Sequence, residues 1–316
     1  MSEFSKTQVL VTGGNGAIGC NLVKKLLDYD AKVTVLDDFS QSKQGNLHSS
    51  KNLQIIKGDI TNSKVLKKTF SHNYKFVFHL AARFANEMSI KDPYEDLRVN
   101  IEGTLKLLME SAKHNVNRFI YASSSSLYGQ SNSVTKKENS IPKPSTPYAA
   151  SKLSGEFYCN AISELYSLDY VIVRLSNCYG PYDPPGKFRN VIPNFIKAAL
   201  ANRNLIITGN GNETRDFTFV DDIVDGIILA ATKQKGRNEL FNLGTGNETK
   251  ISVIAQQTIK NTKSKSKIVF RSRRSFDHIT RRRMDISKAK KLLGYNPKTN
   301  IFDGIKKTCI WAQQNW

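Results

Sequence analysis

The sequence predicts an α/β fold in which a parallel sheet carries helices on both faces. Two observations lead to this prediction. Over the first 125 residues, short apolar runs rich in β-branched residues alternate with longer segments of helical period, and a glycine-rich turn follows the first run. The chain has 316 residues, of which 39% are hydrophobic, so it can bury a sizeable core.

The elements follow from these patterns in chain order. Strands are predicted at Gln8–Thr12, Lys32–Leu36, Leu53–Lys57, Phe76–Leu80, Arg118–Ser123 and Tyr170–Leu175. Amphipathic helices are expected at Gly16–Tyr29 and Val99–Lys113, where apolar residues share one helical face, and another helix follows Pro147. This order is typical of a Rossmann-type doubly wound parallel sheet.

The second half of the chain has a different texture. Prolines gather between Ser140 and Pro147, and a Gly/Pro-rich loop, Tyr179–Gly186, precedes less regular alternation. We therefore predict a Rossmann domain at residues 1–180 and a smaller C-terminal α/β lobe at residues 181–316, with some interleaving of the two.

Composition narrows the class of protein. No run of 18 apolar residues and no signal-peptide pattern is present, so we expect a cytoplasmic protein with no membrane segment. The four cysteines are scattered without a C-x-x-C motif, which argues against a disulfide framework and a zinc site, and no metal is expected.

The charge is strongly positive. Lys and Arg number 47 against 27 Asp and Glu, a net charge of +20 that attracts nucleotides, nucleic acid or anionic membranes. The clusters Arg271–Arg274 and Arg281–Arg283 fit a solvated surface as well as a binding site. Because no basic stripe is interleaved with aromatic residues, nucleic acid is not the expected partner.

The turn after the first strand predicts a dinucleotide site. Gly13, Gly16 and Gly19 have the spacing that permits a tight turn, close approach of the backbone to a pyrophosphate, and close packing of the following helix. The second strand ends at Asp37 and Asp38, where an acid is expected to bind the ribose hydroxyls. Because this acidic pair repels a 2′-phosphate, NAD is favoured over NADP.

Asp59 and Ile60 follow the third predicted strand. Asp59 fits two roles equally: contact with the adenine edge, or a turn or helix N-cap.

A second motif carries chemistry. Tyr148 and Lys152 lie four residues apart and therefore share a helix face. A nearby ammonium and a positive nicotinamide ring both lower the pKa of a phenol toward the range of a working base. The serine run from Ser123 to Ser126 ends a sheet strand, where ligands of open α/β sheets bind.

With these motifs, the sequence resembles the extended short-chain dehydrogenases/reductases, and within them the NAD-dependent epimerase/dehydratase family of nucleotide-sugar enzymes, nearly from end to end. Further matching blocks are His79–Ala82, Val99–Thr104, Arg174–Pro181, Arg215–Asp222, Asp285–Ala289 and Leu292–Tyr295. The resemblance implies that Tyr148 takes the proton of the sugar 4-hydroxyl, that Lys152 holds the nicotinamide ribose, and that Ser124 hydrogen-bonds the same hydroxyl.

The resemblance also implies the residues that bind the ligands. For NAD they are Gly13, Gly16, Ala17, Ile18, Gly19, Asp37, Asp38, Asp59, Ile60, Leu80, Ala81, Ala82, Asn100, Tyr148 and Lys152. For the nucleotide sugar they are Ser124, Ser125, Asn177, Val191, Arg215 and Arg274. The two arginines would clamp the diphosphate, since a guanidinium fork matches phosphate oxygens.

Departures from the family pattern favour one reaction. Ser125 and Ser126 stand where 4,6-dehydratases carry two acids, and decarboxylases usually keep a glutamate at the position of Ser126. No Cys/His pair supports epimerisation at C3 and C5, and His278 is a lone candidate. The resemblance therefore points to a 4-epimerase acting through a 4-keto sugar, with a UDP-hexose, UDP-hexosamine or UDP-uronic acid as substrate.

Alternatives remain open at this point. A 4-ketoreductase of a nucleotide-deoxysugar, consuming NAD(P)H, would use the same three residues, and a UDP-uronic acid decarboxylase is a further reading. A nucleic-acid-binding protein on this scaffold is a distant one. The resemblance also implies a homodimer formed through helices near Val99–Lys113 and Tyr148–Tyr166.

Overall fold

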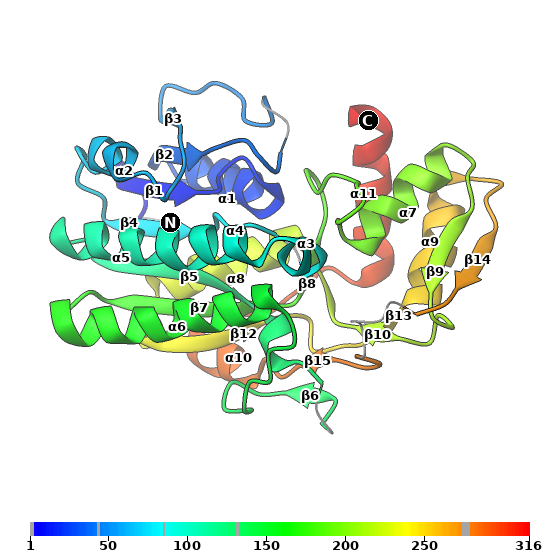
Figure 1. Ribbon diagram of the computed structural model, residues 1–316. Coiled ribbons are helices and arrows are strands. Elements are labelled where there is room, and N and C mark those ends of the chain that lie inside the picture. Colours follow the sequence, from blue (N-terminus) through cyan, green and yellow to red (C-terminus); the bar gives the residue numbers. More distant parts are fainter. Residues whose placement is uncertain (1–2, 43–44, 85, 131–132, 274–278) are drawn as a thin grey trace.

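The computed structural model describes residues 3–42, 45–84, 86–130, 133–273 and 279–316 (Figure 1). Its centre is a parallel sheet with the order β12-β7-β5-β4-β1-β2-β3. The strands are β1 (Gln8–Thr12), β2 (Lys32–Asp37), β3 (Leu53–Lys57), β4 (Phe76–His79), β5 (Arg118–Ser124), β7 (Tyr170–Leu175) and β12 (Glu239–Leu243). The strand order reverses between β1 and β4, which confirms the predicted Rossmann-type doubly wound fold.

All six predicted strands are present, with ends that agree within one residue. β12 was not predicted, because polar residues interrupt its apolar pattern. Asn242 is fully buried in this strand. Its amide donates to the carbonyls of Lys136 (2.9 Å) and Asp285 (3.1 Å) and accepts from the Tyr128 hydroxyl (2.7 Å). Tertiary hydrogen bonds thus make a polar residue acceptable in the strand.

Helices cover both faces of the sheet (Figure 1). α1 (Ala17–Asp28) packs with α8 (Val220–Thr232) on one face, and α5 (Thr104–Lys113) with α6 (Pro147–Tyr166) on the other. The residues of β1 divide accordingly: Val9 and Val11 join the core under α1 and α8, and Leu10 joins the core under α5 and α6. This is the period-two alternation of a strand.

The predicted helix at Val99–Lys113 is not uniform. It starts with π-helical turns at Arg98–Gly103 (η1) and continues as α5. The other helices of this part are α2 (Ser63–Thr69), α3 (Asn86–Lys91), α4 (Pro93–Leu97), η2 (Ser125–Tyr128), η3 (Gln234–Gly236) and α10 (Ser287–Leu293).

A separate apolar core forms the second lobe, where α7 (Val191–Leu200), α9 (Ile251–Thr262) and α11 (Ile301–Asn315) pack together. Its short strands and those beside it pair as β8 (Asn177–Tyr179) with β11 (Phe217–Phe219), β9 (Leu205–Thr208) with β14 (Ile268–Arg271), β10 (Thr214–Arg215) with β13 (Thr249–Lys250), and β6 (Thr135–Lys136) with β15 (Arg283–Met284). Within the described ranges, no helix is both long and apolar enough to span a bilayer.

Candidate active site

A cleft of about 730 Å³ lies at the carboxyl ends of the sheet strands and is closed on its other side by the second lobe. Most of the predicted site residues line it: Gly13, Gly16, Ala17, Ile18, Gly19, Asp37, Asp38, Asp59, Ile60, Leu80, Ala81, Ala82, Ser124, Ser125, Tyr148, Lys152, Asn177, Val191 and Arg215. Asn100 is not among the lining residues. Arg274 and His278 lie outside the described residues.

The glycine turn is packed so tightly that side chains are excluded. Gly13 has φ +69°, and an added Cβ would lie 2.6 Å from the amide nitrogen of Ala81. A Cβ on Gly19 would lie 2.2 Å from the carbonyl oxygen of Gly13. The first turn of α1, whose N–H groups have no partner in a preceding turn, therefore borders the cleft, an arrangement that suits a pyrophosphate.

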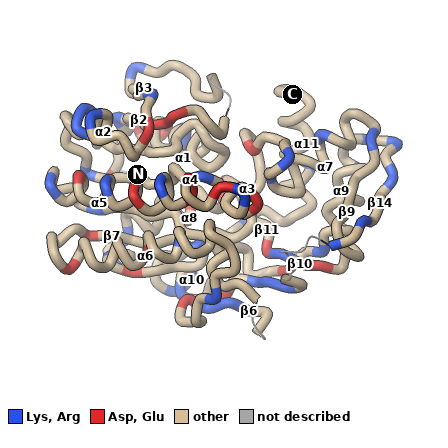
Figure 2. The backbone as a smooth tube through the Cα atoms, in the orientation of Figure 1, with Lys and Arg blue, Asp and Glu red and all other residues tan. Residues whose placement is uncertain are grey.

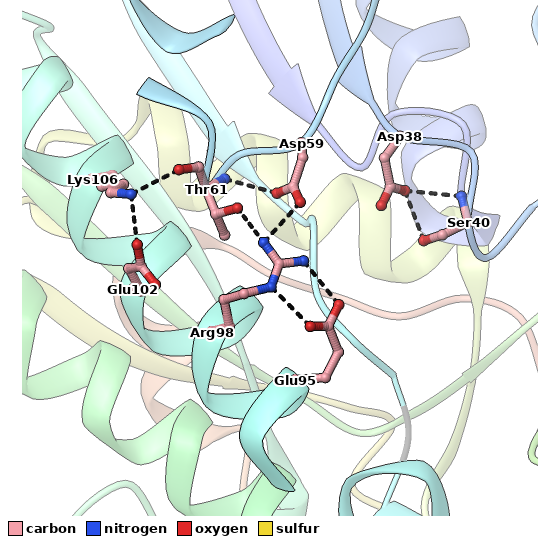
Figure 3. Close-up of polar contacts among 8 residues, drawn as sticks. All are labelled: Asp38, Ser40, Asp59, Thr61, Glu95, Arg98, Glu102 and Lys106. Carbon is pink, nitrogen blue, oxygen red and sulfur yellow. Dashed lines mark hydrogen bonds and ion pairs between the residues drawn. The ribbon is translucent and has the colours of Figure 1, made fainter. Parts of the chain in front are cut away.

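The two acids after β2 differ in their surroundings. Asp37 is 8% exposed, and its carboxylate accepts from the backbone amides of Asn15 (2.9 Å) and Phe39 (2.8 Å). Burial raises its pKa, against the effect of these hydrogen bonds. Asp38 accepts from the backbone (2.9 Å) and hydroxyl (2.7 Å) of Ser40, as Figure 3 shows. Both carboxylates fit a sugar hydroxyl better than a phosphate.

Asp59 belongs to an ion-pair cluster with residues of α4 and η1 (Figure 3). Its carboxylate accepts from the Thr61 amide (2.8 Å) and from Nη1 of Arg98 (2.9 Å). Arg98 also grips Glu95 with Nε (2.8 Å) and Nη2 (2.9 Å). Burial acts to raise the pKa of Asp59, but the hydrogen bonds from Thr61 and Arg98 together bring it below its ordinary value. Asp59 thus forms a turn while lining the cleft, and Asn62 is the N-cap of α2.

Asn100 joins η1 to α6. Its Oδ1 accepts from the Arg83 amide (2.7 Å), and its Nδ2 donates to Asp96 (2.8 Å) and Ser151 (3.3 Å). The side chain is buried, so its hydrogen bonds fix the helix that carries Tyr148.

Tyr148 and Lys152 lie near the start of α6, which Thr146 caps by accepting from the amide of Ala149 (3.2 Å). Burial raises the pKa of Tyr148 well above its usual range, although a hydrogen bond with Ser124 acts to lower it. Burial likewise lowers the pKa of Lys152 to about 8, against the negative charge of Asp96. Burial, rather than the Lys152 charge, is thus the largest influence on the phenol.

Lys152 is held by two neighbours. Its Nζ donates to the carbonyl of Ala122 (2.9 Å) and lies 6.0 Å from the ring centre of Tyr148. Ser124, Tyr148 and Lys152 therefore form a compact group at the carboxyl end of β5. A hydroxyl, a phenol and an ammonium in this arrangement suit proton transfer to and from a substrate hydroxyl.

The predicted substrate residues come from both lobes. Ser124 and Ser125 follow β5, and the hydroxyl of Ser126 donates to that of Ser124 (2.9 Å). Asn177 begins β8, Val191 begins α7, and Arg215 ends β10. The structure therefore brings together segments that lie far apart in the chain around one cleft.

Sequence reasoning missed Arg282 as a cleft residue. It is 8% exposed, lines the cleft, and donates from Nη1 to the carbonyl of Ser125 (3.2 Å). A signal was available, because burial alternates from Arg281 to Met284 as in a strand. The run of three arginines concealed that alternation.

Known proteins share this fold and these motifs. The NAD dependent epimerase/dehydratase family matches residues 9–244. UDP-glucose 4-epimerase of Mycolicibacterium smegmatis is 34% identical over 305 residues, which cover 95% of this chain and 97% of that protein. Relatives of similar identity include dTDP-D-glucose 4,6-dehydratases and a UDP-N-acetyl-alpha-D-glucosaminuronate decarboxylase.

Two solved structures extend the likeness to the whole chain. Epimerase Mth375 from Methanothermobacter thermautotrophicus has 40% identity and a TM-score of 0.98, with 99% of this chain and 94% of that chain covered. UDP-glucuronic acid 4-epimerase from Bacillus cereus, in complex with UDP-glucuronic acid and NAD, has 30% identity and a TM-score of 0.89, with 98% and 100% covered. With its sequence, its sheet order and its cleft all in agreement, the chain belongs to the NAD dependent epimerase/dehydratase family.

Proposed function

We propose that this protein is an NAD-dependent nucleotide-sugar 4-epimerase that acts on a UDP-sugar. The observation that carries the proposal is the group of Ser124, Tyr148 and Lys152 in the cleft, beside a glycine turn suited to a dinucleotide. The named epimerases among its relatives support the same activity.

The cofactor residues are proposed as follows. The first turn of α1, with Gly16, would bind the pyrophosphate, Asp37 the adenosine ribose, and Asp59 with Ile60 would border the adenine. NAD supplies the acceptor for the hydride of C4 and returns it later in the same turnover. Tyr148 and Lys152 complete the site at the nicotinamide end.

The proton chemistry falls to Tyr148. It takes the proton of the 4-hydroxyl as C4 is oxidised and gives it back when the 4-keto sugar is reduced from its other face, so no net reductant is consumed. Ser124 hydrogen-bonds the same hydroxyl and fixes its orientation. Because burial raises the pKa of Tyr148, the positive charge of Lys152 is needed to stabilise the phenolate.

The rest of the cleft fits the nucleotide sugar. Asn177, Val191 and Arg215, together with Arg274, are the proposed diphosphate contacts. Ser125 and Ser126 carry no acid or base for eliminating water across C5 and C6, which favours epimerisation over dehydration. The 4-keto intermediate therefore keeps its C6 substituent and is reduced again at C4.

A homodimer is the proposed assembly. α5 and α6 lie side by side and present Met109, Phe157 and Leu165 to solvent, with side chains 38%, 65% and 73% exposed. Phe157 and Leu165 are eight residues apart on one face of α6, and apolar stripes of this kind are buried in dimers. A cytoplasmic location is proposed as well, in keeping with cysteines that are free at all four positions.

The decisive experiment is an NMR time course with UDP-glucose, UDP-N-acetylglucosamine and UDP-glucuronic acid, each with catalytic NAD and no reduced cofactor. We expect the 4-epimer of at least one sugar to appear without net NADH. Tyr148→Phe is the matched control, and it should bind NAD while losing turnover by about 1,000-fold. Unchanged spectra for all three sugars, or consumption of added NADH with a 4-keto sugar, would refute the epimerase.

A further inference from the structure

The three arginines of the basic cluster Arg281–Arg283 have different environments. Arg281 is exposed and pairs with Glu248 (Nη2–Oε2 2.6 Å), and Arg283 is exposed and donates to the hydroxyl of Thr135 (2.7 Å). Arg282 lies between them and points inward, because residues 281–284 alternate between exposed and buried. Two of the arginines are surface residues, and the third belongs to the cleft.

Arg282 lies at the end of the cleft where the reaction is proposed. Its Nη1 donates to the carbonyl of Ser125 (3.2 Å), and Ser125 follows Ser124, the hydrogen-bond partner of Tyr148. The guanidinium is therefore within one residue of the group that would hold the sugar 4-hydroxyl. The proposed diphosphate residues Asn177 and Arg215 belong to β8 and β10 instead.

A second buried cation strengthens the positive field there. Lys136 is 2% exposed on β6, which pairs with β15 so that Lys136 lies opposite Met284. Burial lowers the pKa of Lys136, and the positive charge of Arg282 lowers it further. Two buried cations on paired segments produce a local potential that favours an anion.

The position identifies which anion fits. In a hexose ring, C1 carries the diphosphate and C4 lies at the opposite end, so the substituents beside C4 are the C3 hydroxyl and the C6 group on C5. Resting on the proposed 4-epimerase, we propose that Arg282 is a specificity residue that binds the C6 carboxylate of a UDP-uronic acid. A guanidinium fork matches a carboxylate in charge and in geometry.

The test compares sugars that differ at C6 alone. We would measure kcat/KM for epimerisation of UDP-glucuronic acid and of UDP-glucose by the wild type, Arg282→Gln, Arg282→Lys and the matched control Arg283→Gln. The wild type should prefer the uronic acid, and Arg282→Gln should lower that preference roughly 10- to 100-fold. Arg282→Lys should retain part of it, and Arg283→Gln should leave it unchanged.

Two results would overturn the inference while the epimerase stands: a wild type that prefers UDP-glucose, or an Arg282→Gln variant that loses both sugars equally. A thermal melt shows whether Arg282→Gln is folded, and Arg282→Lys replaces it if it is not.

A binding measurement separates this inference from the proposed function. Calorimetry on Tyr148→Phe with NAD compares the affinities of UDP-glucuronic acid and UDP-glucose without turnover. Tighter binding of the uronic acid that disappears on adding Arg282→Gln supports the carboxylate site even if no sugar is epimerised. Equal affinities for the two sugars in Tyr148→Phe would refute it.

Discussion

Arg174 and Glu156 form a buried bidentate ion pair that ties β7 to α6. Nε of Arg174 lies 2.9 Å from Oε1 of Glu156 and Nη2 lies 2.7 Å from Oε2, with side chains 5% and 6% exposed. The hydroxyl of Ser123 donates to the same carboxylate (2.5 Å). The pair thus fixes the helix of Tyr148 and Lys152 against the strand end that carries the serines.

We expect Glu156→Gln to destabilise the protein by about 3–5 kcal/mol, because it leaves the Arg174 charge buried without its carboxylate. Urea unfolding of wild type and variant measures the difference. Asp225→Asn is the control, since Asp225 pairs with Lys25 at the surface (3.4 Å), and should cost less than ~1 kcal/mol. Similar losses in the two variants would contradict the buried role.

Lys152 should make stability depend on pH. Burial lowers its pKa to about 8, against an ordinary value of 10.5, so between these pH values the unfolded chain holds more protons than the folded one. Stability contributed by this group therefore rises with pH through that window and is lowest below pH 8. The unfolding free energy of wild type relative to Lys152→Met should rise by about 1 kcal/mol from pH 8 to 9.5. A flat difference would place the ammonium in a more solvated site.

The sheet and the motifs of the cofactor end could be predicted because their signals are local. A buried parallel strand such as Tyr170–Leu175 is apolar throughout, and the spacing of Gly13, Gly16 and Gly19 follows from one tight turn. The i, i+4 pair of Tyr148 and Lys152 requires nothing beyond the helix itself.

What could not be predicted depends on contacts between distant segments. Asp59 and Arg98 meet across 39 positions of sequence, and Arg282 reaches Ser125 across 157. Asn242 is tolerated in β12 because three partners from elsewhere satisfy its amide. No periodicity encodes such pairs, since they arise when packing brings the elements together.

Asp37 should determine the choice of cofactor. We expect Asp37→Asn to weaken NAD binding roughly 10-fold and to narrow the preference for NAD over NADP, because the negative charge that repels a 2′-phosphate is removed. The asparagine Oδ1 can still accept from one of the two backbone amides that Asp37 holds, so the turn should persist. Fluorescence titrations with both cofactors measure the ratio. An unchanged ratio would place the ribose elsewhere.

Arg98 should act on the cofactor through Asp59. Its guanidinium holds Asp59 and Glu95 together at the cleft wall (Figure 3), and Figure 2 shows acidic segments close to it. In Arg98→Gln the two carboxylates lose the cation between them, so the pKa of Asp59 should rise toward its ordinary value. We expect NAD affinity to fall roughly 10-fold, with kcat at saturating NAD little changed.

The matched control for this prediction is Lys106→Gln. Lys106 belongs to the same cluster and donates to the carbonyl of Thr61 (2.7 Å) and to Glu102 (2.6 Å), but its amine pairs with neither Asp59 nor Glu95. NAD titrations should therefore separate the two variants, with Lys106→Gln close to wild type. Equal weakening by both would mean that the Thr61 turn as a whole, rather than the Arg98 charge on Asp59, sets the affinity for the adenine end.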